Sequence, residues 1–122
     1  MRIQLKQLCV IGAFFLMVAC ESKDDTKKVL GSWAGVTWTA NGQPSQNDAE
    51  KTFFSFDTTG AYTYTYAGHV EKGTFKVSQD ELFTTPQNEL EMMVKIAKAT
   101  TDTLVFKMSR GGQEEELTLV RR

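Results

Sequence analysis

Side chains that could carry out catalysis are few in this chain of 122 residues. Its single histidine, His69, cannot build a usual structural metal site alone, and no serine nucleophile stands in a strand-to-helix elbow that could use it as a base. Gly111-Gly112 is followed by a predicted strand rather than a helix, so no phosphate-binding loop is indicated. We interpret Glu114-Glu115-Glu116 as a charged edge or a solvent-facing strand. The sequence therefore predicts no enzyme, no cofactor and no metal.

Cys20 has the clearest chemistry, because its thiol stands where an apolar segment ends. Arg2 and Lys6 precede a charge-free apolar run over residues 8–19, shorter than the roughly 20 residues that a membrane-spanning helix needs. A positive start and a short apolar run that ends in small residues are typical of a secretory signal peptide. Residues 16–20, Leu-Met-Val-Ala-Cys, resemble the lipobox of bacterial lipoproteins, with methionine where leucine is commoner. We therefore predict a signal peptide over residues 1–19 and a lipid anchor on Cys20.

A polar tether is predicted over residues 20–28, followed by one domain over residues 29–122. Lys23-Asp24-Asp25 resembles a short acidic export signal of Bacteroidetes lipoproteins, so we expect an outer-membrane lipoprotein of the cell envelope, with surface and periplasmic positions both open. Without Arg2 and Lys6, 12 of the 14 Lys and Arg remain against 15 Asp and Glu, a net charge of −3. That charge disfavours a nucleic-acid partner, which would require a basic patch.

Short β-rich segments separated by turn residues fill the predicted domain. Tyr62, Tyr64 and Tyr66 alternate with threonines, which is the period of a strand. Eight strands at this spacing indicate an all-β sandwich or barrel. The predicted strands cover residues 30–39, 52–57, 61–67, 69–78, 81–85, 92–99, 103–109 and 114–121.

Residues 88–99 fit two patterns. Asn88 and Glu91 have the spacing of a helix capping box, and several apolar residues after them match helical spacing. The alternative is a strand with Met92, Val94 and Ile96 on one face. We prefer a strand from residue 92, because the strand predicted after residue 102 needs a hairpin partner.

The turns between nearly all neighbouring strands are short, which favours an up-and-down meander. Eight antiparallel strands closed on themselves leave no exposed edge, whereas an open meander would present two. We therefore predict a small eight-stranded up-and-down barrel.

Five motifs, taken in order, resemble the lipocalin-like domains of small Bacteroidetes lipoproteins. They are Gly31-Ser32-Trp33, residues 56–62 (Phe-Asp-Thr-Thr-Gly-Ala-Tyr), Gly73-Thr74-Phe75, residues 102–106 (Asp-Thr-Leu-Val-Phe) and residues 117–121 (Leu-Thr-Leu-Val-Arg). The resemblance covers nearly all of residues 29–122. The chain is much shorter than a typical lipocalin and lacks that family's Thr-Asp-x-Tyr motif, so ligand binding by the longer relatives transfers poorly.

The resemblance implies that Trp33 plugs one end of the barrel beneath Arg121, in a cation–π contact. Trp33 and Val36 have opposite parity along the strand, so we expect a bulge at Gly35 that turns both side chains inward.

The aromatic content provides the candidate ligand-binding residues, and it leaves a filled core and an open cavity as alternatives. The first hypothesis is a membrane-anchored module that binds a small, partly apolar ligand, with residues 40–49 as a lid. The second is a solid barrel that binds an envelope protein or a glycan through its outer face, where Phe53 and Phe83 would be exposed. The candidate inward residues are Trp38, Phe54, Phe56, Tyr62, Tyr64, Tyr66, Phe75 and Phe106.

Overall fold

The computed structural model describes residues 25–122. The predicted signal peptide and Cys20 lie outside the described residues, so they stay predictions. All eight expected strands are present, and residues 92–99 form a strand rather than a helix. The structure adds a two-residue strand, β2, and a short 3-10 helix, η1, which the sequence analysis missed. The elements are β1 (Gly31–Ala40), β2 (Gln43–Pro44), η1 (Ala49–Lys51), β3 (Thr52–Phe56), β4 (Ala61–Tyr66), β5 (His69–Ser78), β6 (Glu81–Pro86), β7 (Met92–Ala99), β8 (Thr103–Arg110) and β9 (Gln113–Arg121).

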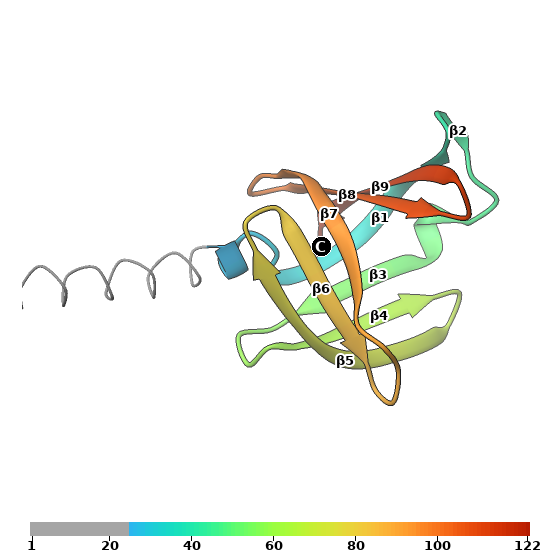
Figure 1. The fold of residues 1–122 in the computed structure, drawn as a ribbon. Coiled ribbons are helices and arrows are strands. Elements are labelled where there is room, and N and C mark those ends of the chain that lie inside the picture. Colours follow the sequence, from blue (N-terminus) through green and yellow to red (C-terminus); the bar gives the residue numbers. More distant parts are fainter. Residues whose placement is uncertain (1–24) are drawn as a thin grey trace, which may run out of the picture.

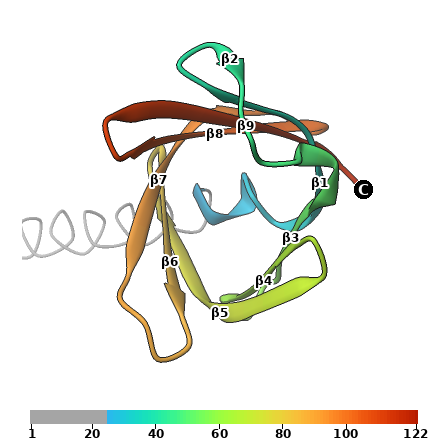
Figure 2. The ribbon, with the colours of Figure 1, turned by 90° about the vertical axis from the view of Figure 1, so that its right-hand side faces the viewer.

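The eight long strands form a closed antiparallel barrel, which confirms the predicted fold (Figures 1 and 2). Each long strand pairs with the next one along the chain, except that β1 pairs with β3 past the short β2. The ring closes where β1 pairs with β9, from Trp33 opposite Arg121 to Ala40 opposite Glu115. The closed barrel and its buried core lie within residues 25–122, so we expect this part of the chain to fold without the residues before it.

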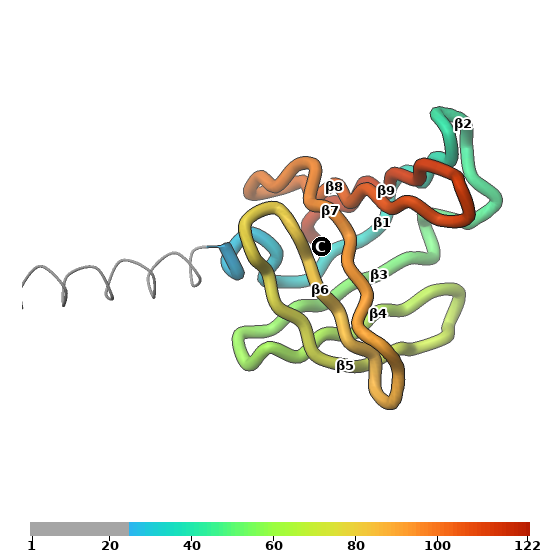
Figure 3. Tube along the Cα trace, in the orientation of Figure 1, coloured from blue at the N-terminus to red at the C-terminus, as the bar shows by residue number. Residues whose placement is uncertain are grey.

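The end of the barrel next to the N-terminal segment is closed. Val29, just before β1, is fully buried there. Asp25 accepts a hydrogen bond from the backbone N–H of Gln79 (2.8 Å), and Lys28 Nζ donates to the Gln79 carbonyl (3.1 Å). The Gln79 bond holds the pKa of Asp25 below its usual value. Residues 25–28 therefore pack against the turn between β5 and β6, although the predicted tether extended to residue 28; the tube in Figure 3 shows this approach.

A bulge in β1 allows two tryptophans to face the interior. The register against β9 shifts between Gly35 and Thr37, and Trp33 and Trp38 are both buried on either side of the shift. The bulge is where the sequence placed it, but Val36 is 47 % exposed, so the expectation that Val36 points inward was wrong. Val36 is the extra residue that the bulge turns outward. A Cβ atom on Gly35 would collide with the carbonyl oxygen of Ala49, so glycine lets η1 pack on β1.

The turn between β4 and β5 carries a strained residue. Ala67 and Gly68 both have positive φ angles, 51° and 86°, as a two-residue type I′ hairpin turn requires. Ala67→Asn should stabilise the protein by about 1 kcal/mol, since asparagine tolerates this conformation far better than alanine. The melting temperature should rise by about 4–8 °C in thermal denaturation. Ala67→Gly relieves the same strain but loosens the unfolded chain, so it should gain less. A fall in melting temperature with both variants would contradict this account.

Candidate ligand-binding site

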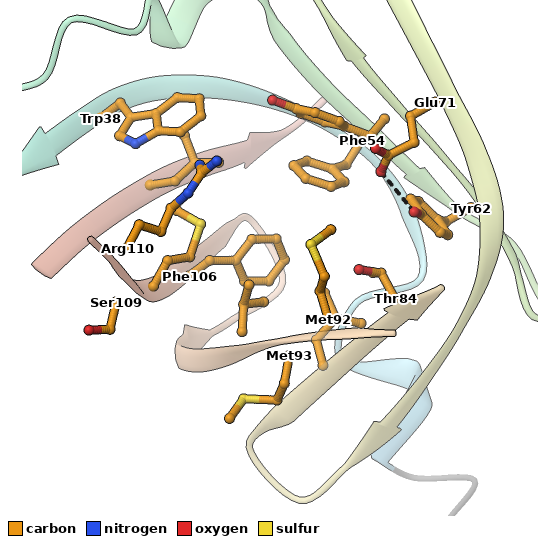
Figure 4. A pocket seen from close by; sticks show the side chains of 15 residues that line it. Trp38, Phe54, Tyr62, Glu71, Thr84, Met92, Met93, Phe106, Ser109 and Arg110 are labelled. Atoms are coloured by element: carbon orange, nitrogen blue, oxygen red, sulfur yellow. Dashed lines mark hydrogen bonds between the residues drawn. The ribbon is translucent and has the colours of Figure 1, made fainter. Parts of the chain in front are cut away.

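The half of the barrel away from residue 25 encloses a cavity of about 480 Å³ (Figure 4). Its wall comes from β1 and from every strand between β3 and β9. Figure 4 shows Phe54, Phe106 and Met92 directed toward the middle of this space, whereas Met93 and Ser109 lie at its edge. The lining residues are Trp38, Phe54, Tyr62, Tyr64, Glu71, Leu82, Thr84, Met92, Met93, Val94, Phe106, Met108, Ser109, Arg110 and Leu117.

Five of the eight aromatic candidates line this cavity, two lie in the buried core, and one packs beside a lining residue. Phe56 and Phe75 are buried in the core and meet edge to face, with their ring centroids 5.0 Å apart. Tyr66 meets the Trp38 ring edge-on at 6.1 Å, and its hydroxyl accepts a hydrogen bond from the Asp48 backbone. The barrel is therefore solid near residue 25 and open beyond. The five that line the cavity are Trp38, Phe54, Tyr62, Tyr64 and Phe106.

The polar group within the cavity is a tyrosine–carboxylate pair. The Tyr62 hydroxyl donates a hydrogen bond of 2.8 Å to Glu71 Oε2, drawn as a dashed line in Figure 4. Burial raises the pKa of the Tyr62 hydroxyl, and the negative charge of Glu71 raises it further. Burial is also the main cause of the raised pKa of Tyr64, followed by Glu71, while Arg110 opposes the shift. Both hydroxyls thus remain protonated and able to donate hydrogen bonds at neutral pH.

A second carboxylate lies beside the mouth of the cavity. Glu115 is only 8 % exposed, so the interpretation of residues 114–116 as a charged edge or a solvent-facing strand does not hold for this residue. Its Oε1 accepts a hydrogen bond of 2.7 Å from Trp38 Nε1, which compensates its burial. Arg110 Nε stands 3.9 Å from the other oxygen of Glu115, with 60 % of its side chain exposed. The mouth therefore holds one partnered anion and one largely solvated cation.

The closed end contains the contact that the resemblance implied. The Arg121 guanidinium lies 4.2 Å from the centroid of the fully buried Trp33 ring. Trp33 Nε1 donates to the Val29 carbonyl (2.8 Å), and Arg121 donates to the carbonyls of Leu30 (3.0 Å) and Thr101 (2.7 Å). Gly31 has a φ angle of 114°, which residues with a side chain rarely adopt, and a Cβ atom there would also displace the guanidinium, so glycine suits the position two residues before the tryptophan.

The loop between β1 and β3 contributes no side chain to the cavity wall. None of residues 40–49 is among the lining residues, and the expected role of this loop as a lid stays a prediction. Asn41 and Ser45 bind the backbone at Glu114 and Trp38, which holds the loop beside the barrel wall. Aspartate at position 48 accepts from the N–H of Glu50 and so begins η1.

Outside the barrel, the two aromatics expected to be free have cationic neighbours. Phe53 lies beneath Arg122, 4.4 Å from ring centroid to guanidinium, and Lys76 Nζ lies 5.5 Å from the Phe83 centroid. His69 is exposed at the start of β5. Within residues 25–122, no three His, Cys, Asp or Glu side chains gather in a group that could hold a metal ion. The same residues contain no helix long and apolar enough to cross a membrane.

A family model described as a lipocalin-like domain matches residues 29–106, more than half of the chain. The chain belongs to this lipocalin-like family. The match ends within β8, yet β9 is the strand that closes this lipocalin-like barrel. A search of curated proteins found no match.

Solved structures from two Bacteroides species share the lipocalin-like fold. A lipocalin-like protein from Bacteroides uniformis superposes with a TM-score of 0.60 at 10 % identity, over 78 % of this chain and 99 % of that one. An uncharacterized protein from Bacteroides eggerthii gives a TM-score of 0.59 at 12 % identity, over 76 % of this chain and 98 % of that one. At this identity the likeness concerns the fold alone, and it confirms the resemblance to Bacteroidetes lipocalin-like proteins drawn from the sequence.

The sequence analysis missed the aliphatic and charged part of the site. Leu82, Val94 and Leu117 line the cavity, as do Glu71 and Arg110. The alternation of inward and outward side chains along each strand would have identified these residues. Arg110 is two residues beyond Met108, and Glu71 is four residues before Phe75, so each shares the inward face of its strand.

Proposed function

We propose that this protein is a non-catalytic binding lipoprotein of the bacterial outer membrane, which holds a small, partly apolar molecule in the open half of its barrel. The observation that carries the proposal is the cavity of about 480 Å³ lined mostly by aromatic and aliphatic side chains. Ligand sites in proteins have this character, an apolar wall with a few placed polar groups, and lie at the mouths of β-barrels. The Tyr62–Glu71 pair supplies such a polar group.

The envelope location rests on the sequence. An apolar run too short to span a membrane, followed at once by Cys20 and a polar stretch, supports cleavage and acylation at that cysteine. Two or more acyl chains hold a protein stably at a membrane without a spanning helix.

The alternative, a solid barrel that binds an envelope protein or glycan on its outside, has less support. It requires a filled interior, whereas the structure contains a cavity. It also relied on Phe53 and Phe83 as exposed aromatics, and both are only half-exposed beneath cationic side chains.

Filling the cavity tests the binding proposal. Val94 lines the cavity, so Val94→Phe should occupy its space and weaken the binding of an environment-sensitive apolar dye about tenfold, a change of about 1.4 kcal/mol. Fluorescence titration of soluble residues 21–122 measures this effect. The matched control is Val70→Phe, which makes the same change at a side chain 59 % exposed on the outer face. Equal dye affinity in the two variants would place binding outside the barrel and contradict the proposal.

A further inference from the structure

The cavity contains a carboxylate that forms no ion pair with a cation of residues 25–122. Glu71 and Arg110 are the charged residues that line it, and Glu115 adjoins them. Glu115 has both the indole N–H of Trp38 and the nearby Arg110 as partners. Among residues 25–122, the side-chain partner of Glu71 is the neutral hydroxyl of Tyr62. The three charges sum to one negative charge, and it resides on Glu71.

The second oxygen of Glu71 is accessible to solvent. Tyr62 binds Oε2, and no buried side-chain oxygen or nitrogen in the described part of the chain lacks a hydrogen-bond partner. The other oxygen of this half-buried residue is therefore accessible to solvent, and the residue lines the cavity. A ligand that fills the space expels that solvent. Removing water from an ionised carboxylate is costly unless a new donor or cation replaces it.

The surrounding side chains favour a positive charge at this place. Glu89, in the turn between β6 and β7, adds to the negative field that Glu71 exerts on the Tyr62 hydroxyl. Phe54 and Tyr64 stack with their ring centroids 4.7 Å apart, and both line the same cavity. Aromatic faces attract cations through their negative faces, most strongly where water is excluded. An ammonium group at this place would thus contact both a carboxylate and aromatic faces.

Arg110, the cation that lines the cavity, would stabilise an anionic ligand less than Glu71 would stabilise a cationic one. The Arg110 side chain is 60 % exposed at the mouth and lies near Glu115. An anionic headgroup could meet it only in solvent, where an ion pair contributes little. Deeper in the cavity the same headgroup would face Glu71 and be repelled.

We infer that the site selects ligands with an apolar body and a positively charged amine, which pairs with Glu71, over neutral or acidic ligands of the same shape. This inference rests on the proposed function, because it names the class of ligand for the same cavity. The apolar body lies against Phe106, Leu82 and Met92, and the amine lies between Glu71 and the aromatic faces. The amine replaces the water that Glu71 loses when the ligand enters.

Three water-soluble probes of one shape test the inference: phenylbutylamine, phenylbutanol and phenylbutyrate. Calorimetric titration of residues 21–122 should rank the amine first and the carboxylate last. Glu71→Gln keeps an oxygen acceptor for Tyr62 but removes the charge, so it should weaken amine binding about tenfold or more and strengthen alcohol binding. Glu116→Gln removes the same charge from the outer face of β9 and should leave all three affinities unchanged.

The possible outcomes distinguish an error in the inferred ligand class from an error in the proposed ligand-binding function. Binding of the carboxylate as tightly as the amine, or an unchanged amine affinity in Glu71→Gln, overturns the inference and leaves the ligand-binding function standing. Failure of all three probes to bind overturns both. Should Glu71→Gln not fold, Arg110→Gln gives a second measurement, since it should tighten the amine and weaken the carboxylate. An unchanged ratio between those two affinities in Arg110→Gln also overturns the inference.

Discussion

Replacing Trp33 by alanine should lower the free energy of unfolding by about 3–5 kcal/mol, the usual effect of removing a large buried aromatic side chain. The ring is fully buried at the closed end of the barrel, and its removal also deprives Arg121 of its aromatic partner and the Val29 carbonyl of a donor. Small domains have about 5–15 kcal/mol of stability in total, so the loss is a large part of it. Urea denaturation followed by circular dichroism measures the change.

Two further variants make this test specific. Trp33→Phe keeps an aromatic ring under Arg121 but loses the hydrogen bond to Val29, so it should cost about 1–3 kcal/mol. Val36→Ala changes a half-exposed residue of the same strand and should stay within about 0.5 kcal/mol of the natural protein. If Trp33→Ala were no more destabilising than Val36→Ala, the plug would have no role in holding the barrel closed.

Replacing Cys20 by serine should abolish acylation, so that the mature domain is no longer held at the membrane by lipid. A hydroxyl cannot take the place of the thiol in lipoprotein acylation, and residues 25–122 contain no helix long and apolar enough to cross a membrane. Each methylene lost from the bilayer removes about 0.8 kcal/mol of membrane affinity, so the loss of whole acyl chains leaves no stable attachment. Detergent partitioning should move the mature domain from the detergent phase to the aqueous phase, and mass spectrometry should find lipid on the natural N-terminal cysteine alone.

Cys9→Ser is the matched control for the anchor. It makes the same atomic change within the predicted signal peptide, so acylation and partitioning should stay as they are in the natural protein. An unmodified Cys20 at the natural N-terminus, or cleavage elsewhere, would show that the lipobox interpretation is wrong. The barrel itself should melt cooperatively in either case, because its core lies within residues 29–119.

The strands were predictable because each one alternates and ends at a turn residue. Along β4 the three tyrosines share one face, and Gly60 and Gly68 mark its ends with positive φ angles. The strand character of β7 needed an argument beyond the local pattern, since the apolar residues near Leu90 match helical spacing equally well. The pairing of β7 with its chain neighbours β6 and β8 decides for the strand, and that pairing is not visible in the pattern of residues 88–99 alone.

The charged part of the site was predictable in principle but was missed. Leu117 and Leu119 are buried in β9, and alternation places Glu115 on their face. A run of three glutamates is typical of a solvent-exposed strand. The hydrogen bond that Trp38 donates to Glu115 compensates the cost of burying this one carboxylate. That donor lies on β1, 77 residues away in sequence, so no local pattern reveals it. The two-residue β2 pairs with the end of β1 across a short turn, and η1 packs on Gly35 of the same strand.

The opposition between the closed end and the cavity has a consequence for how an anchored barrel would stand on a bilayer. Residues 25–28 bind the turn between β5 and β6 at the closed end, so the chain leaves the barrel there. Five residues, 20–24, can bridge at most about 17 Å between a lipidated Cys20 and Asp25. The lipid headgroups would therefore face the end that Trp33 seals, and the mouth would point into the aqueous phase. A ligand would therefore enter the cavity from the aqueous phase and not directly from the lipid bilayer.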